Sequence, residues 1–200
     1  MKDTIVLYPN LGTGHLVSMV ELGKLILTQY PSLSITILIL TPPITPSTTT
    51  IACDSNARYI TTVTATTPAI TFHHVPFNFN TPSLPLHILS LEFTRHSTQN
   101  ITVALQTLAK ASNLKALVMD FMNFNDPKAL TKNLNNNAKD PSSQSYQALL
   151  QLPENMEDGV GIITNTFEGI EEKPIRTLSE DVTIPPLFCV RPMISAPYGE

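Results

Sequence analysis

The feature that most constrains the fold is a short apolar run that leads through a glycine-rich turn into a helix. The run Ile5–Tyr8 predicts a buried parallel strand, and Gly12-Thr13-Gly14 predicts a tight turn after it. Apolar residues at helical spacing predict an amphipathic helix over 15–30, which Pro31 ends, and the β-branched run 33–40 predicts a second strand. A strand, a helix and a strand in this order almost always form a right-handed crossover in a parallel sheet, so the chain begins as an α/β fold.

The same alternation continues along the rest of the chain. Further strands are predicted at 69–75, 115–119, 161–164 and 185–190, and further helices at 52–57, 86–111, 127–134, 142–152 and 168–178. Alternating strands and helices predict an α/β domain with a doubly wound parallel sheet. The 200 residues are 42% hydrophobic and only 14% charged, which is enough apolar surface for a folded core.

Charge and cysteine content argue against several classes of protein. The net charge is −4 and no basic stripe occurs, so nucleic-acid binding is not expected. No apolar run approaches the roughly 20 residues that span a bilayer, and the N-terminal residues do not form a signal peptide. Cys53 and Cys189 match no metal or redox spacing and are expected to be reduced and partly buried. We therefore expect a cytoplasmic protein that does not bind nucleic acid and does not span a membrane.

His15 and Asp120 are the candidate chemical groups, because each follows an apolar strand. The carboxyl ends of parallel strands face one crevice, where open α/β folds bind ligands. A carboxylate beside an imidazole holds the ring in one tautomer and stabilises the imidazolium that forms when a hydroxyl is deprotonated. The start of the helix disfavours imidazolium, which predicts a neutral His15. The alternative is that His15 is a cap or a surface residue and that Asp120 only caps a turn.

The glycines raise a second alternative, a turn that binds a dinucleotide. The full fingerprint requires a third glycine, where Val17 stands, and an acidic residue after the second strand, where the chain has Thr41-Pro42. We therefore favour glycines that only permit the turn, and a nucleotide-binding oxidoreductase is not favoured. The sequence contains no phosphate-loop lysine, no nucleophile elbow and no histidines at metal-binding spacing, so it predicts neither a cofactor nor a metal.

Three segments, in sequence order, resemble plant family 1 UDP-glycosyltransferases, with the strongest likeness to legume isoflavone and flavonoid O-glucosyltransferases. The segments are Leu7–Leu16, Leu117–Phe121 and Ile163–Glu171. The resemblance implies a GT-B fold of two facing Rossmann-like halves, of which this chain is the N-terminal half that binds the acceptor. In that family the other half binds the UDP-sugar, so UDP-glucose is a co-substrate, and no cofactor or metal is required.

The resemblance also assigns roles to individual residues. It implies that His15 deprotonates a hydroxyl of the acceptor, that Asp120 balances the charge, and that the hydroxyl attacks the anomeric carbon with inversion. The expected partner is a small phenolic molecule of the flavonoid or isoflavone type. The residues expected to contact it are Gly14, Phe79, Leu84, Leu86, Phe121 and Asn123. The alternatives are ordinary core packing for the apolar residues and capping of the next helix for Asn123.

The chain also departs from the family pattern. It has no tryptophan, although the family's donor motif begins with one, and the interval from Asp120 to Asn165 is shorter than in the family. We therefore predict an acceptor domain over 1–190 that is shortened near 135–141, the start of an interdomain linker over 191–200, and no UDP-sugar domain. The protein is expected to be a monomer that is inactive with UDP-glucose. The alternative function is a fragment that binds an aromatic acceptor without catalysis.

Overall fold

The computed structural model describes residues 1–10, 12–41, 51–76, 86–120, 159–190 and 193. For 51–55, 86–96, 98 and 168 only the backbone is described. The chain divides into two compact units, one of Met1–Asn123 with Ser195–Glu200 and one of Phe124–Ile194. The predicted domain over 1–190, its shortening near 135–141 and the linker over 191–200 stay predictions.

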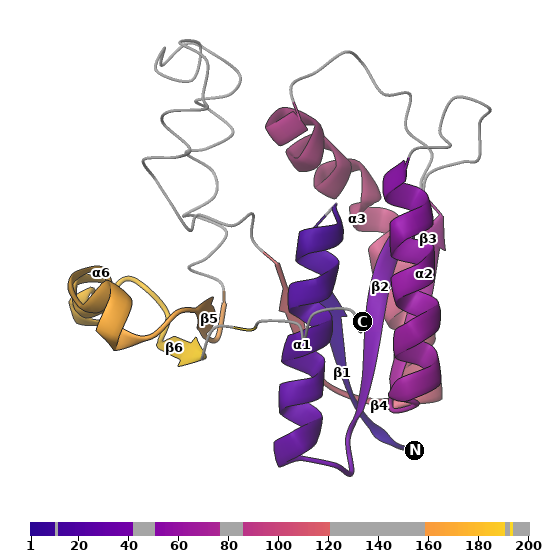
Figure 1. The fold of residues 1–200 in the computed structure, drawn as a ribbon, viewed down its shortest axis with the longest axis horizontal. Coiled ribbons are helices and arrows are strands. Elements are labelled where there is room, and N and C mark those ends of the chain that lie inside the picture. Colours follow the sequence, from indigo (N-terminus) through magenta and orange to yellow (C-terminus); the bar gives the residue numbers. More distant parts are fainter. Residues whose placement is uncertain (11, 42–50, 77–85, 121–158, 191–192, 194–200) are drawn as a thin grey trace, which may run out of the picture. The chain divides into compact units, whose positions relative to one another are not determined.

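The first unit is built on a sheet of four parallel strands (Figure 1). The strands are β1 (Asp3–Tyr8), β2 (Ser34–Thr41), β3 (Ile70–Pro76) and β4 (Asn113–Met119). Their order in the sheet is β3-β2-β1-β4, so the chain first extends the sheet on one side of β1 and then returns to add β4 on the other side. This topology confirms the predicted α/β fold with a doubly wound parallel sheet.

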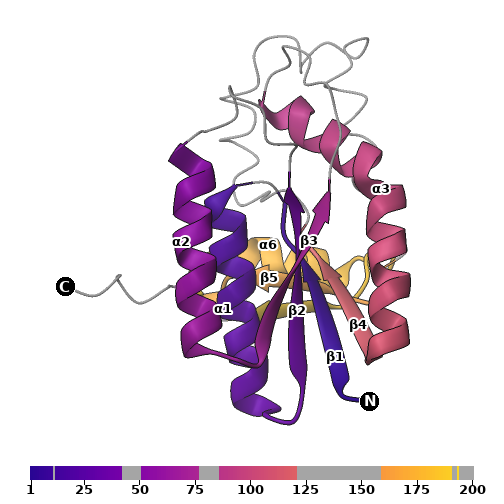
Figure 2. The same cartoon turned by 90° about the vertical axis from the view of Figure 1, so that its right-hand side faces the viewer.

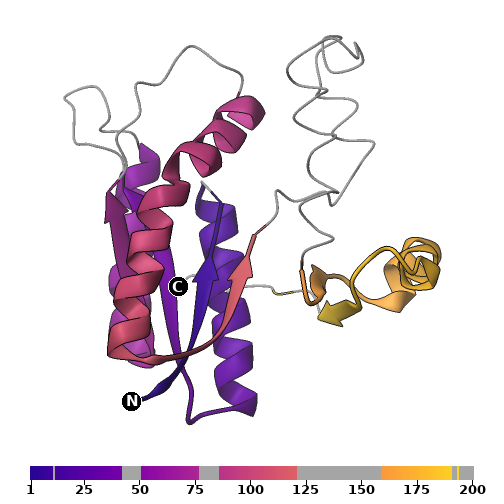
Figure 3. The same ribbon diagram turned by 180° about the vertical axis from the view of Figure 1, so that it is seen from behind.

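Three helices cover the two faces of this sheet. Helices α1 (Thr13–Gln29) and α2 (Ile51–Thr66) lie on one face, and α3 (Leu86–Ala111) lies on the other (Figures 2 and 3). Helix α3 has the bounds that the sequence predicted. Because the central strands have helices on both faces, they are continuous apolar runs rather than alternating ones.

Helix α2 is much longer than the predicted segment 52–57. Its second half is rich in threonine, which has a low helix propensity. Tyr59 and Val63 nevertheless pack into the core, with 5% and 2% of their surface exposed. The hydroxyls of Thr61, Thr62 and other threonines bond to carbonyls one turn earlier, so they are satisfied within the helix. Tertiary burial of one helix face therefore outweighs the local propensity.

The core of the first unit lies on both sides of β1 and β2. On the α1 side, Gly23 lets the helix approach the sheet, since a β-carbon there would lie 3.3 Å from Ile35 Cγ2 and 3.4 Å from Leu7 Cδ1. On the α3 side, the buried cluster consists of Val6, Tyr8, Leu38, Val75, Ile101 and Ala104. This packing holds the carboxyl ends of the strands in fixed positions, where the candidate site lies.

The second unit contains a parallel pair of short strands, β5 (Ile162–Asn165) and β6 (Leu187–Val190), joined through helix α6 (Glu168–Glu180). These elements agree with the strands and the helix predicted there. Helix α6 is kinked at Glu171 and contains Pro174, whose ring cannot fit a regular helix interior. The predicted helices over 127–134 and 142–152 lie outside the described residues.

Cys189 on β6 is a free, exposed thiol, so the prediction that it is partly buried is wrong. The two-stranded pair covers little of its own surface, which leaves Phe188 beside it exposed as well. Cys53 belongs to the residues whose side chains are not described. Within the described helices, none is both long enough and apolar enough to cross a membrane.

Candidate active site

The structure brings His15 and Asp120 together at the carboxyl edge of the first unit's sheet. His15 is in the first turn of α1, which follows β1, and Asp120 follows directly after β4. Strand β4 pairs with β1 so that Met119 lies opposite Tyr8, and Asp120 N–H donates to the Tyr8 carbonyl at 2.9 Å. His15 Nδ1 then lies 2.8 Å from Asp120 Oδ2. The predicted pairing of these two side chains is therefore present.

The turn before His15 depends on glycine at one position. Gly12 has φ 113° and ψ 151°, a backbone conformation that residues with a β-carbon rarely adopt. It is the N-cap residue of α1, its carbonyl accepts from Leu16 N–H, and no side chain caps the helix. The interpretation of these glycines as turn formers is thus supported at Gly12, and His15 is not the cap.

Asp120 sets both the tautomer and the charge preference of His15. A carboxylate can only accept, so neutral His15 donates from Nδ1 and presents Nε2 as the basic atom. The hydrogen bond to Asp120 raises the pKa of His15; desolvation by partial burial opposes this, and the negative charge of Asp120 adds to it. The expectation that the helix start keeps His15 neutral is therefore outweighed by the carboxylate.

The two side chains differ in their access to ligands. The His15 side chain is 24% exposed, whereas that of Asp120 is 11% exposed. Gly14 lies on the exposed surface beside them, and a β-carbon there would have no atom within 4 Å. A ligand can therefore approach the first turn of α1 closely, reach the imidazole and leave the carboxylate shielded behind it.

The other residues expected to contact an acceptor are not placed at this site. Leu86 begins α3, but its side chain is not described. Phe79, Leu84, Phe121 and Asn123 lie outside the described residues. Their predicted roles stay predictions.

Sequence reasoning missed one polar residue near the turn, Asn56 of α2. It lines a small cavity together with Gly12, and its side-chain oxygen is buried. Asn56 precedes the buried Tyr59 by three positions and the buried Val63 by seven. That spacing places all three on one face of a helix, so a correct length for α2 would have revealed it.

The end of β2 has no carboxylate that could hold a ribose. Thr41 occupies that position, and its hydroxyl lies 3.0 Å from His74 Nδ1 at the end of β3. Among the side chains that the structure describes, no three histidines, cysteines or carboxylates cluster as metal ligands would. The site is thus a histidine–carboxylate pair suited to moving a proton.

Comparison with known sequences identifies plant relatives along the whole chain. Isoflavone 7-O-glucosyltransferase 1 of Glycine max is 61% identical, and the alignment covers 100% of this chain and 55% of that protein. UDP-glycosyltransferase 2 of Pueraria montana var. lobata is 57% identical, with the same coverage of both chains. The chain spans about half the length of these relatives. The alignments extend over 261 and 259 positions, more than the 200 residues of this chain, so the relatives contain positions that it lacks. No protein-family model matches the chain.

Solved structures of similar fold are also plant glycosyltransferases. Apo UGT2 of Phytolacca americana superimposes with a TM-score of 0.74 at 20% identity, over 98% of this chain and 53% of that chain. UGT71G1 of Medicago truncatula, solved with UDP-glucose, gives a TM-score of 0.66 at 21% identity, over 97% of this chain and 52% of that one. These likenesses establish that the parallel sheet and its helices are a Rossmann-like half of a GT-B fold. Along its whole length the chain is similar in sequence to plant UDP-glycosyltransferases, and its fold is that of the Rossmann-like half of their solved structures.

Proposed function

We propose that this chain supplies the acceptor side of a glucosyl transfer from UDP-glucose to a hydroxyl of a flavonoid or isoflavone. The observation that carries the proposal is the 2.8 Å contact between His15 Nδ1 and Asp120 Oδ2. The relative from Glycine max is named as an isoflavone 7-O-glucosyltransferase, which supports this class of acceptor.

In this proposal His15 is the general base. The acceptor hydroxyl donates to Nε2, the proton moves to the imidazole, and the oxygen attacks the anomeric carbon from the side opposite UDP. A bond forms between that oxygen and the carbon, the bond to the UDP oxygen breaks, and UDP leaves with the electron pair, which inverts the configuration. Asp120 stabilises the imidazolium that forms in this step.

The electrostatics of the pair favour a phenol over an aliphatic alcohol. A phenolic hydroxyl has a pKa near 10, far below that of an ordinary alcohol. The hydrogen bond that His15 donates to Asp120 raises the pKa of His15 and so strengthens it as a base. A smaller difference between the pKa of the acceptor hydroxyl and that of His15 makes the proton transfer easier. A flat phenol could also lie against exposed Gly14 while its hydroxyl meets the ring.

We propose that UDP-glucose is bound by a part of the relatives' length that this chain does not span. The chain spans about half the length of its relatives, and the described site contains one base and its carboxylate but no phosphate-binding cation. We therefore propose that residues 1–200, assayed alone, bind a phenolic acceptor without transferring glucose. The second candidate function, a binding module for aromatic ligands, follows from the same coverage.

The proposal is tested by the ionisation of a bound acceptor. An isoflavone with a free 7-hydroxyl is added to the 200-residue chain, and its phenolate absorbance is titrated against pH. The apparent pKa of the bound hydroxyl should be lower than that of the free isoflavone, and His15→Ala should abolish the difference. His74→Ala is the control, since it removes an exposed histidine at the end of β3.

Two results would contradict the proposal. Equal hydroxyl pKa values in the parent chain and in His15→Ala would remove His15 from the base role. Release of isoflavone glucoside by residues 1–200 with UDP-glucose would disprove the binding-only assignment of the isolated chain.

A further inference from the structure

Tyr8, the last residue of β1, joins three elements of the first unit. Its carbonyl accepts from Asp120 N–H at 2.9 Å, which ties β1 to the residue that follows β4. Its side chain packs on the α3 side of the sheet, where the hydroxyl lies 3.2 Å from Ser97 Oγ of α3. Tyr8 and Ser97 are both buried, with 8% and 0% of their surface exposed. The residue that holds Asp120 through its backbone therefore also holds α3 through its side chain.

The two hydroxyls lie in an otherwise apolar layer. Tyr8 packs in one buried cluster with Ile101 and Ala104 of α3, and Ser97 lies on the same face of that helix, one and two turns earlier. Apolar contacts have no preferred direction, whereas a hydrogen bond requires a short distance and a defined angle. If α3 turned or slid by one residue, apolar side chains could form new contacts, but the two hydroxyls would separate. The pair therefore fixes the rotation and the axial position of α3 on the sheet.

The first half of α3 extends beyond the sheet. Figures 2 and 3 show its backbone rising past the carboxyl ends of the strands and leaning over that edge. Leu86, the first residue of α3, lies about 16 Å along the helix axis from Ser97, at 1.5 Å per residue. A small rotation at Ser97 therefore becomes a large displacement at the start of the helix. The same edge of the sheet carries the bonded pair of His15 and Asp120.

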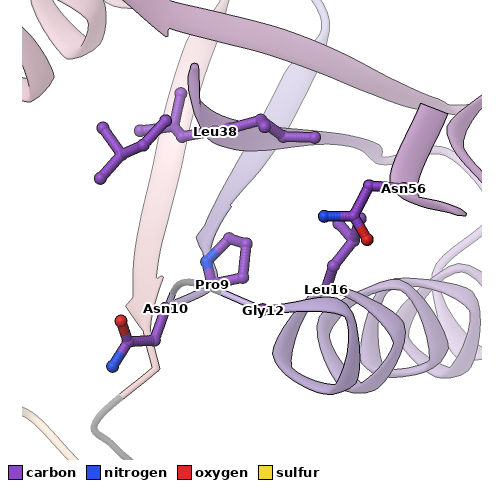
Figure 4. Close-up of a pocket in the computed structure, with 8 residues that line it drawn as sticks. Pro9, Asn10, Gly12, Leu16, Leu38 and Asn56 are labelled. Carbon is purple, nitrogen blue, oxygen red and sulfur yellow. The ribbon is translucent and has the colours of Figure 1, made fainter. Parts of the chain in front are cut away.

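The turn that follows Tyr8 is packed less tightly than Tyr8 itself. Pro9, Gly12 and Leu16 line a cavity of about 50 Å³ together with Leu38, between the starts of α1 and α2 (Figure 4). Side chains that border a void lose contacts on that side. The fixed point at the carboxyl end of β1 is therefore Tyr8 rather than the turn.

We propose that Tyr8 and Ser97 are positioning residues for the acceptor site, because their contact holds the first half of α3 over the edge that carries His15 and Asp120. The inference rests on the proposed function in one respect, namely that an acceptor binds at this edge. Neither residue acts on the reacting atoms. Tyr8 meets Asp120 only through its backbone, so loss of either hydroxyl should leave the bond between His15 and Asp120 in place.

Residual dipolar couplings of the 200-residue chain measure the orientation of α3 without any ligand. In the parent chain, the backbone amides of residues 87–96 and those of β1 should fit a single rigid body. In Tyr8→Phe and in Ser97→Ala, the couplings of residues 87–96 should shrink toward zero, while those of residues 101–111 should stay unchanged. Because both hydroxyls belong to one bond, the double variant should show no further loss.

Two control variants separate this hydrogen bond from side-chain volume and from the helix itself. Ser97→Cys keeps a side chain of similar size but carries only a weak S–H donor, so it should behave like Ser97→Ala. Ser112→Ala removes a hydroxyl at the other end of α3, where it bonds to the Leu108 carbonyl, and should change no coupling in residues 87–96.

Isoflavone binding shows whether the position of α3 matters to the acceptor. Ser97→Ala should weaken binding about fivefold, the equilibrium equivalent of one buried hydrogen bond, but should keep the lowered hydroxyl pKa of the bound isoflavone. His15→Ala should instead abolish the lowered hydroxyl pKa. This split distinguishes a residue that positions the acceptor from one that takes its proton.

Unchanged couplings of residues 87–96 in folded Ser97→Ala would overturn the proposal, since the bond would then contribute stability without fixing α3. Unchanged isoflavone affinity in that variant would overturn it as well. A parent chain that does not lower the hydroxyl pKa would contradict the proposed function, and the couplings would still decide the role of Tyr8 and Ser97. If Tyr8→Phe failed to fold, Ser97→Ala would test the same bond.

Discussion

His15 and Asp120 are 105 positions apart in the chain, yet their side chains are joined by a hydrogen bond of 2.8 Å. The link is a consequence of strand pairing. Because β4 lies beside β1, the first residue after β4 donates its backbone N–H to the last residue of β1. The carboxylate is thereby held next to the first turn of α1, which carries the His15 imidazole. The geometry of the His15–Asp120 pair therefore depends on the pairing of β4 with β1 at the edge of the sheet.

Replacing the carboxylate should lower the pKa of His15. Asp120→Asn keeps a hydrogen-bonding oxygen but removes the negative charge, and the bond to Asp120 is the main cause of the raised value. The measurement is a titration of the His15 ring followed by nuclear magnetic resonance. Asp181→Asn, at an exposed carboxylate in the second unit, is the control. An unchanged His15 pKa in Asp120→Asn would mean that the contact is not formed in solution.

The stability contributed by this pair should decrease as the pH rises. The pKa of His15 is higher in the folded chain than its ordinary value of 6.5, so folding binds a proton. The contribution is fully present below pH 6.5 and is lost as the pH rises through the folded pKa of His15. Because the imidazole is partly exposed, we expect less than about 1 kcal/mol. Urea unfolding of the parent chain and of His15→Gln at pH 6 and pH 9 measures it.

The test is whether the stability contributed by His15 decreases or increases as the pH rises. The parent chain should be more stable than His15→Gln by a larger margin at pH 6 than at pH 9. A margin that grows with pH would show that desolvation of the imidazolium, not the hydrogen bond that His15 donates to Asp120, dominates.

Gly12→Ala should destabilise the first unit. The backbone at Gly12 has φ 113°, which strains any residue with a β-carbon, and the expected loss is about 1–3 kcal/mol in the free energy of unfolding. Gly14→Ala is the matched control two residues later, where φ is ordinary for a helix and the added methyl meets nothing within 4 Å. It should leave stability unchanged or raise it slightly. Equal losses in the two variants would contradict the role given to the turn.

Tyr8→Phe should weaken the packing of α3 on the sheet. The Tyr8 hydroxyl lies 3.2 Å from Ser97 Oγ inside the core, and burial raises the pKa of Tyr8, so it stays neutral. Loss of one buried hydrogen bond should cost about 1 kcal/mol of unfolding free energy, measured by urea denaturation. Tyr30→Phe removes a hydroxyl from an exposed tyrosine and should have no effect. If Tyr8→Phe left the free energy of unfolding unchanged, the stabilisation at this position would come from the aromatic ring alone.

Most of the elements were accessible from the sequence because their signals are local. The apolar run at β1 and the long periodic pattern of α3 each depend on residues a few positions apart. The threonine-rich half of α2 has no such signal, since its helix is held by the burial of Tyr59 and Val63. The prediction for α2 was therefore too short, and Asn56 was missed with it.

For the candidate site, too, the sequence predicted one part of the arrangement and the tertiary structure decided the rest. The sequence predicted that His15 and Asp120 each follow an apolar strand and face one crevice, and the strand order then brought the two side chains into contact. Its expectation that the helix start disfavours the imidazolium was opposite to the raised pKa of His15, because that pKa balances a hydrogen bond against desolvation at a particular distance and burial. The exposure of Cys189 was missed for a similar reason, since a short strand with one partner looks locally like a buried one.

The sequence by itself determined the alternation of strands and helices, the glycine turn and the identity of the two chemical groups. These follow from side-chain periodicity and from the missing β-carbon of glycine, which act over a few residues. Only the tertiary structure decided that β4 lies beside β1, that the carboxylate meets the imidazole, and that the Asn56 oxygen is buried. Those outcomes depend on how segments far apart in the chain pack together, and no local pattern encodes the resulting distances.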